Sequence, residues 1–216
     1  MRTVTAVCFD LDDTLYDYHE YAEAGLRSAA DLLEARTGDS FHDELHELYF
    51  EAGITDGTFD RLLDRHDLPA DLLDDLVTAY HSATEPLTPY DDTEDVLSVL
   101  GSNHQLGLLT DGRGGHAKLR RLGIREYFDA VLVTSTIGRS KHELTVFERM
   151  LSELSVPPWD TAYIGDDPRV DFRVPNDLGM QTVRLRRGRY ADLEPAEAAA
   201  APDREVDELA SLLCYF

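Results

Sequence analysis

The sequence contains very little lysine. Lys118 and Lys141 are its only lysines in 216 residues, although lysine and arginine together number 20. Aspartate and glutamate number 43, so the formal net charge is −23. Because a surface this negative repels nucleic acid and anionic membranes, we expect neither as a partner. An excess of acidic residues with little lysine resembles proteins of salt-loving organisms. The chain is therefore either a halophilic protein or an ordinary acidic cytosolic one. A melting temperature that depends on salt concentration would indicate the halophilic protein.

Cysteine and long apolar runs are also scarce. Cys8 and Cys214 are the only cysteines. Cys8 lies inside an apolar run, which predicts a buried thiol rather than a disulfide scaffold of the secreted type. No apolar run approaches the ~20 residues of a membrane-spanning helix, and Asp10 comes too early for a signal peptide. We therefore expect a soluble, cytoplasmic protein, while its oligomeric state cannot be predicted from this sequence.

Short apolar runs alternate with amphipathic segments along most of the chain. This alternation predicts an α/β fold with a doubly wound, Rossmann-like parallel sheet that is covered on both faces. In such sheets, ligands bind beyond the carboxyl ends of the strands. After a low-complexity, alanine-rich segment at 194–202, we expect a C-terminal helix at Asp203–Leu213. The predicted strands are Val4–Phe9, Leu106–Leu109, Ala130–Thr134, Ala162–Ile164 and Gln181–Leu185.

One long interval interrupts the alternation. Between the first two predicted strands, the leucine, alanine and tyrosine residues recur with helical spacing. Pro86 and Pro89 end this interval. We expect residues 16–86 to form an all-helical cap domain, inserted into a Rossmann-like core that consists of residues 1–15 and 87–216.

Acidic and polar residues follow several predicted strands. Asp10 and Asp12 follow the first strand and Thr110 ends the second. Asp166 follows the fourth strand, with Asp171 one turn further. Carboxylates that converge in this way repel one another unless a cation neutralises them. Oxygen ligands with open water positions suit Mg²⁺, so the sequence predicts a magnesium site at this edge of the sheet.

Four short motifs stand in order along the chain. They read DLDDTL at 10–15, LLTDG at 108–112, GRSK at 138–141 and IGDDPRVD at 164–171. They resemble the four motifs of the haloacid dehalogenase-like (HAD) hydrolase superfamily. The resemblance covers nearly the whole chain, including a helical insertion directly after the first motif. It implies a Mg²⁺-dependent phosphatase that hydrolyses a small phosphorylated metabolite through an aspartyl-phosphate intermediate.

The resemblance assigns roles to the matching residues. Asp10 would be the nucleophile, and Asp12 would be first the general acid and then the general base. The catalytic set would be Asp10, Asp12, Thr110 and Lys141. The phosphoryl-binding set would be Thr110, Asp111, Gly112 and Lys141, with backbone N–H groups near Asp111 and Gly112 helping. The magnesium ligands would be Asp10, Asp12 through its backbone carbonyl, Asp166 and, directly or indirectly, Asp171.

Asp12 separates two chemistries within the resemblance. Family members that are dehalogenases carry a different residue there, because a halide leaves without a proton, so Asp12 favours a phosphatase. A 2-haloacid dehalogenase and a non-enzymatic phosphoacceptor or binding relative stay as alternatives. The chain departs from the usual family pattern at His142, where proline is common, and at Asp111 and Asp167, where asparagine or serine is common.

Overall fold

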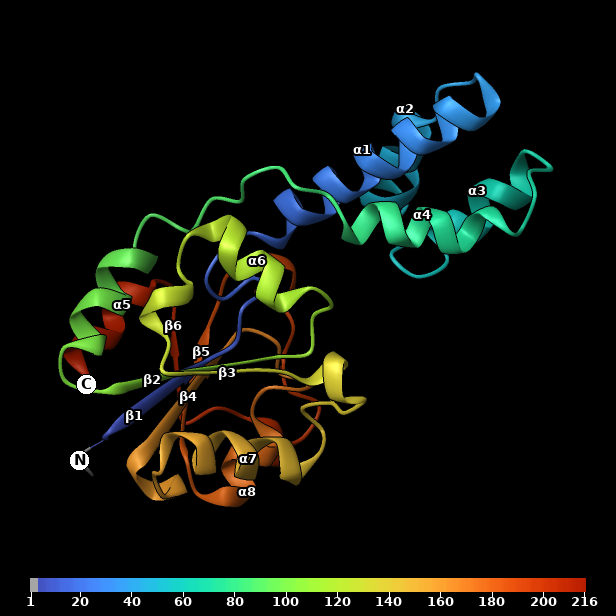
Figure 1. The fold of residues 1–216 in the computed structure, drawn as a ribbon. Coiled ribbons are helices and arrows are strands. Elements are labelled where there is room, and N and C mark those ends of the chain that lie inside the picture. The colour runs from blue at the N-terminus through green and yellow to red at the C-terminus, as the bar shows by residue number, and fades with distance from the viewer. Residues whose placement is uncertain (1–3) are drawn as a thin grey trace. The chain divides into compact units, whose positions relative to one another are not determined.

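The structure is a computed structural model that describes residues 4–216. The chain divides into two compact units (Figure 1). One consists of the chain up to Tyr18 together with Leu87–Phe216, and the other is His19–Pro86. The larger unit contains a single sheet, whereas the smaller unit is helical.

The sheet of the larger unit has six parallel strands in the order β3-β2-β1-β4-β5-β6. Its central strand β1 pairs with β2 on one side and β4 on the other, and every residue of β1 is buried. The order of the strands reverses at β1, so its carboxyl end is the switch point at which ligands bind in such sheets. The strands are β1 Ala6–Phe9, β2 Gln105–Thr110, β3 Ala130–Val133, β4 Thr161–Gly165, β5 Gln181–Leu185 and β6 Arg204–Val206.

Helices cover both faces of this sheet, with α5 and α6 on one face and α7 and α8 on the other (Figure 1). Helix α7 packs on the sheet because its buried side chains recur with helical spacing and form one apolar cluster with residues of the strands. The helix ends at Ser155, which has the left-handed backbone conformation. The helices are α5 Thr93–Gly101, α6 Gly115–Leu122, α7 Leu144–Leu154 and α8 Arg173–Leu178. Short 3₁₀ turns lie at Arg125–Tyr127, Thr134–Ile137, Pro158–Asp160, Gly188–Tyr190, Ala198–Ala200 and Leu209–Cys214.

The predicted α/β sheet is confirmed, and all five predicted strands are present with small shifts at their ends. The buried thiol at Cys8 is also confirmed. The C-terminal helix predicted at Asp203–Leu213 is wrong: β6 and a 3₁₀ turn occupy this segment. Arg184 of β5 and Arg186 directly after it bind Glu205 of β6, and the Asp203 carboxylate accepts a hydrogen bond from the Thr182 backbone. These contacts with β5 outweigh the local preference for a helix.

The smaller unit consists of helices around its own apolar core. Tyr21 packs edge-on against Tyr80, and its hydroxyl lies 2.9 Å from the His81 ring. The predicted helical character of this interval is confirmed, whereas its role as a cap stays a prediction. The elements are α1 Tyr18–Thr37, α2 His42–His46, a π-helical turn at Glu47–Glu51, α3 Thr58–Arg65 and α4 Leu72–His81. Across residues 4–216, no helix combines the length and apolar character needed to cross a membrane.

Candidate active site

A small pocket of about 130 Å³ lies at the carboxyl ends of the central strands. Asp10 directly follows β1, Thr110 is the last residue of β2 and Asp166 directly follows β4. The pocket therefore brings together every site residue predicted from the sequence. Its lining consists of Asp10, Asp12, Thr110, Asp111, Gly112, Lys141, Asp166, Asp167, Val170, Asp171, Arg189 and Tyr190.

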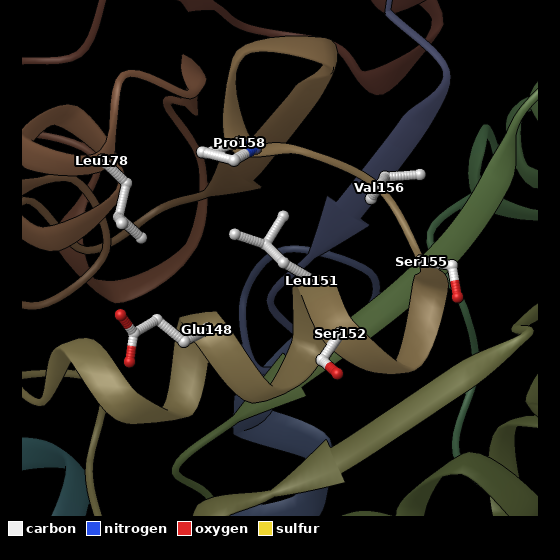
Figure 2. Close-up of a pocket in the computed structure, with 7 residues that line it drawn as sticks. All are labelled: Glu148, Leu151, Ser152, Ser155, Val156, Pro158 and Leu178. Atoms are coloured by element: carbon white, nitrogen blue, oxygen red, sulfur yellow. The ribbon is translucent and has the colours of Figure 1, made fainter.

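A larger hollow of about 560 Å³ lies beside the C-terminal half of α7 (Figure 2). Apolar side chains such as Leu151, Val156 and Leu178 line it, and Glu148 is its only titratable lining residue. The small acidic pocket is therefore the better candidate, because it alone of these two gathers groups that could carry out chemistry.

Lys141 joins two carboxylates at the centre of the acidic pocket. Its Nζ donates to Asp10 Oδ1 and, over 2.7 Å, to Asp171 Oδ1. All three side chains are buried. Burial alone would lower the pKa of Lys141, but the Asp10 and Asp171 carboxylates outweigh burial and hold that pKa well above its usual range. Lys141 is therefore a permanently charged ammonium beside Asp10.

Asp171 is fixed by bonds to both of its carboxylate oxygens. Oδ2 accepts the backbone N–H groups of Asp166 and Asp167, over 3.1 and 2.9 Å, while Oδ1 accepts from Lys141. Gly165 allows this approach, because a Cβ there would stand 2.4 Å from Asp171 Oδ2. The glycine and aspartates of the fourth motif thus build one turn that aims Asp166 into the pocket.

Asp10 and Asp166 have the character of metal ligands. Carboxylate oxygens of Asp10, Asp166 and Asp171 lie within 4.8 Å of one another. Asp166 Oδ1 accepts from Thr14 Oγ1 over 3.2 Å, but the buried Oδ2 has no hydrogen-bond partner among the described residues. Burial raises the pKa of Asp10 to about 7, and burial with the neighbouring carboxylates raises that of Asp166. An unpartnered buried oxygen beside other carboxylates fits a hard divalent cation.

The Asp12 side chain is held by a different set of donors. Lys118 Nζ lies 2.7 Å from each Asp12 carboxylate oxygen, and the Tyr16 hydroxyl donates to Oδ1 over 2.6 Å. Burial would raise the pKa of Asp12, but Lys118 and Tyr16 outweigh burial and lower it. Sequence reasoning assigned no role to Lys118. The rarity of lysine could have drawn attention to Lys118, because the chain contains only two lysines and uses arginine at its other basic positions.

Comparison with known proteins identifies the family. The model of the family described as haloacid dehalogenase-like hydrolase matches residues 7–185. The chain belongs to this family. It is 36% identical to a glyceraldehyde 3-phosphate phosphatase of Methanopyrus kandleri, over 97% of this chain and 96% of that protein. It is 30% identical to a ribulose-1,5-bisphosphate 5-phosphatase of Halopiger xanaduensis, over 94% and 93% of the two chains.

A solved structure of the HAD family has the same fold. The hydrolase YfnB from Bacillus subtilis superimposes with a TM-score of 0.75 at 21% sequence identity, and the match covers 99% of each chain. The parallel sheet with its flanking helices is therefore the fold of HAD hydrolases.

Asp111, one of the departures from the HAD pattern, holds the lysine loop in place. Its carboxylate accepts the backbone N–H of Lys141, over 3.0 and 3.1 Å, and the Thr134 hydroxyl. Its side chain is therefore already occupied, which leaves the backbone as the part of Asp111 available to a phosphoryl group. Thr110 Oγ1 accepts the Gly112 N–H over 3.2 Å, so the second-motif loop is ordered by its own residues.

Arg189 lines the pocket and was also missed by sequence reasoning. It follows β5 and forms an ion pair with the fully buried Asp13, whose Oδ1 also accepts the Tyr18 backbone N–H. Its guanidinium lies 3.7 Å from the centre of the Tyr18 ring. The run RLRRGRY at the end of β5 offered a signal, because the carboxyl end of that strand lies on the same edge as the four motifs.

Proposed function

We propose that the protein is a Mg²⁺-dependent phosphatase that hydrolyses a small phosphorylated metabolite through an aspartyl phosphate on Asp10. The observation that carries this proposal is the buried Asp10 carboxylate, bound by the Lys141 ammonium and lying beside the unpartnered oxygen of Asp166. The curated relatives support the substrate class, because glyceraldehyde 3-phosphate and ribulose 1,5-bisphosphate are both small phosphorylated carbohydrates.

The side chains of Asp10 and Asp166, with the backbone carbonyl of Asp12, would hold the metal. Both oxygens of Asp171 are taken by Lys141 and by two backbone N–H groups, which favours a supporting role for Asp171 over direct coordination. When bound, Mg²⁺ would neutralise negative charge on the phosphoryl group and on its carboxylate ligands.

In the first step, a carboxylate oxygen of Asp10 forms a bond to phosphorus while the bond from phosphorus to the leaving oxygen breaks. Asp12 gives its proton to that leaving oxygen. Lys118 lowers the pKa of Asp12, but the arriving phosphoryl group adds negative charge nearby, which favours the protonated form. Lys141 stabilises the charge that builds up on the phosphoryl oxygens, and Thr110 with the loop N–H groups binds them.

In the second step, Asp12 takes a proton from water, and the water oxygen attacks phosphorus and releases Asp10. The lowered pKa of Asp12 suits this step, because a carboxylate is the form that accepts a proton. Phosphate leaves, and both aspartates return to their starting states.

We further propose that the helical unit His19–Pro86 acts as a cap that excludes bulk water and selects the substrate. Its place in the sequence, directly after the first motif, supports this role. Closing elements of this kind are a common way to protect a reactive intermediate from water.

Hydrolysis of p-nitrophenyl phosphate tests the proposed function. We expect turnover in the presence of Mg²⁺ and its loss on chelation by EDTA. Asp10→Asn should abolish turnover because an amide cannot form the phosphoenzyme, whereas Asp56→Asn in the exposed loop before α3 should leave turnover unchanged. Full activity of Asp10→Asn would contradict the assignment of Asp10 as the nucleophile. Release of halide from a 2-haloacid, without phosphatase activity, would favour the dehalogenase. A panel of phosphorylated metabolites then identifies the substrate.

A further inference from the structure

Lys118 is a buried cation that lies outside the four motifs and performs no step of the proposed mechanism itself. It belongs to α6, and its side chain is only 2% exposed. Burying an ammonium group is costly unless a partner compensates for the lost water. The partner here is the Asp12 carboxylate, with both oxygens 2.7 Å from Nζ.

Two further contacts restrict the same carboxylate. The Tyr16 hydroxyl donates to Asp12 Oδ1, so this oxygen has two donors. On another side lies Gly112, where an added Cβ would stand 2.4 Å from Asp12 Oδ2 and 3.0 Å from Lys118 Nζ. The carboxylate is therefore held by two donors and packed against the second-motif loop.

Asp12 nevertheless lines the pocket, whereas Lys118 does not. Lys118 therefore contacts the pocket lining through the Asp12 carboxylate. Lysine suits this place because its compact ammonium can share one site between two carboxylate oxygens, whereas a planar guanidinium needs a wider space.

We propose that Lys118 is a positioning residue that fixes the Asp12 carboxylate in the orientation required for proton transfer. This inference rests on the proposed phosphatase function, in which Asp12 serves both steps. Without Lys118, Asp12 would keep its chemistry but lose its defined place beside the leaving oxygen. A misplaced proton donor slows the reaction even when every reacting group is present.

The basicity of the leaving group can separate this role from a general effect on folding. In the first step, the leaving oxygen takes a proton from Asp12 as its bond to phosphorus breaks. The p-nitrophenolate ion is weakly basic and leaves without much help, whereas phenolate and alkoxides depend on the proton. The value of kcat/KM reports the steps up to formation of the phosphoenzyme, so a later hydrolysis step does not hide the effect.

The test compares Lys118→Met with the wild-type protein on p-nitrophenyl phosphate, phenyl phosphate and glyceraldehyde 3-phosphate. We expect kcat/KM for the two more basic leaving groups to fall roughly 10²-fold, the scale of proton-transfer catalysis, and that for p-nitrophenyl phosphate to fall less than about 10-fold. Arg120→Met removes an exposed cation from the same helix and should leave all three values unchanged. Lys118→Gln, which keeps a neutral donor, is the second variant in case Lys118→Met does not fold.

The possible outcomes are distinct. An equal loss on all three substrates, or no loss, would overturn the positioning role, because a structural defect does not depend on the leaving group. If the wild-type protein hydrolyses none of the three substrates, the proposed function fails before Lys118 is tested. Tyr16→Phe removes one hydroxyl from the same carboxylate and should give the same pattern with a smaller loss.

Discussion

At the residue scale, Gly112 lets the general acid and its lysine approach the backbone of the second-motif loop. A methyl group at this position would collide with the Asp12 carboxylate and lie in tight contact with Lys118 Nζ. Because neither group is the free end of an unrestrained side chain, the collision has to move Asp12 from its place. Asp12 is therefore sensitive to a change that adds a single carbon atom.

We expect Gly112→Ala to lower kcat/KM for phenyl phosphate roughly 10²-fold, the cost typical of a catalytic group displaced by about 1 Å. Gly101→Ala is the matched control, because an added Cβ there meets its nearest atom at an ordinary 3.4 Å. Steady-state kinetics measure the effect, and circular dichroism checks that both variants fold. Wild-type turnover in Gly112→Ala would show that the close approach is not needed.

Most of the site could be predicted at this scale, because the four motifs mark their residues directly. Lys118 and Arg189 could not, for a physical reason. Lys118 pairs with Asp12 across 106 positions of sequence and Arg189 with Asp13 across 176, so only the folded sheet brings these charges together. Local spacing carries no information about contacts of this range.

At the scale of secondary-structure elements, Arg184 joins β5 to the segments around the pocket. Its side chain is fully buried. The guanidinium donates to the backbone carbonyls of Asp166, Tyr190 and Leu193 and forms an ion pair with Glu205 of β6. One side chain thus holds the end of β4, the turn after β5 and the last strand.

We expect Arg184→Met to lower the free energy of unfolding by about 3 kcal/mol, since one buried and two part-buried carbonyls would lose their donor at ~1–3 kcal/mol each. Arg173→Met removes an exposed arginine from α8 together with two surface ion pairs, and should leave the unfolding midpoint nearly unchanged. Urea denaturation followed by circular dichroism measures both. Equal midpoints for the two variants would contradict the role assigned to Arg184.

The strands differ in how well their sequences predict them. The four residues of β1 and the five of β4 are all buried, and continuous apolar runs of this kind mark interior parallel strands. In contrast, β6 has three residues, of which only Val206 is buried. Acidic residues at 203, 205, 207 and 208 instead favour the start of a helix. The pairing of β6 depends on Arg184 and Arg186, which lie in and directly after β5 and which the sequence of β6 does not show.

At the scale of the whole molecule, stability depends on how the acidic charge is distributed. Several carboxyl groups paired with arginine or lysine have lowered pKa values, among them Asp12, Asp92 and Glu205. These groups stabilise the fold above their unfolded pKa, and that contribution is lost only as the pH falls into the acid range. Asp10 and Asp166 behave in the opposite way, because burial raises their pKa values. Up to about pH 7, Asp10 therefore makes the free energy of unfolding fall as the pH rises.

The pKa of Asp10 rises from its usual 3.8 to about 7 on folding, so within this range the folded protein binds a proton that the unfolded chain does not. Without metal, the free energy of unfolding should therefore fall as the pH rises through this range, and Asp166 contributes with the same sign. Because protons and metal compete for the same oxygens, stabilisation by Mg²⁺ should grow with pH. Melting temperatures with MgCl₂ and with EDTA, taken at about pH 5 and about pH 7.5, measure both effects. Asp166→Asn should lose most of the shift caused by Mg²⁺, whereas Asp56→Asn should keep it. A shift of the same size at both pH values would mean that the metal does not bind through these carboxylates.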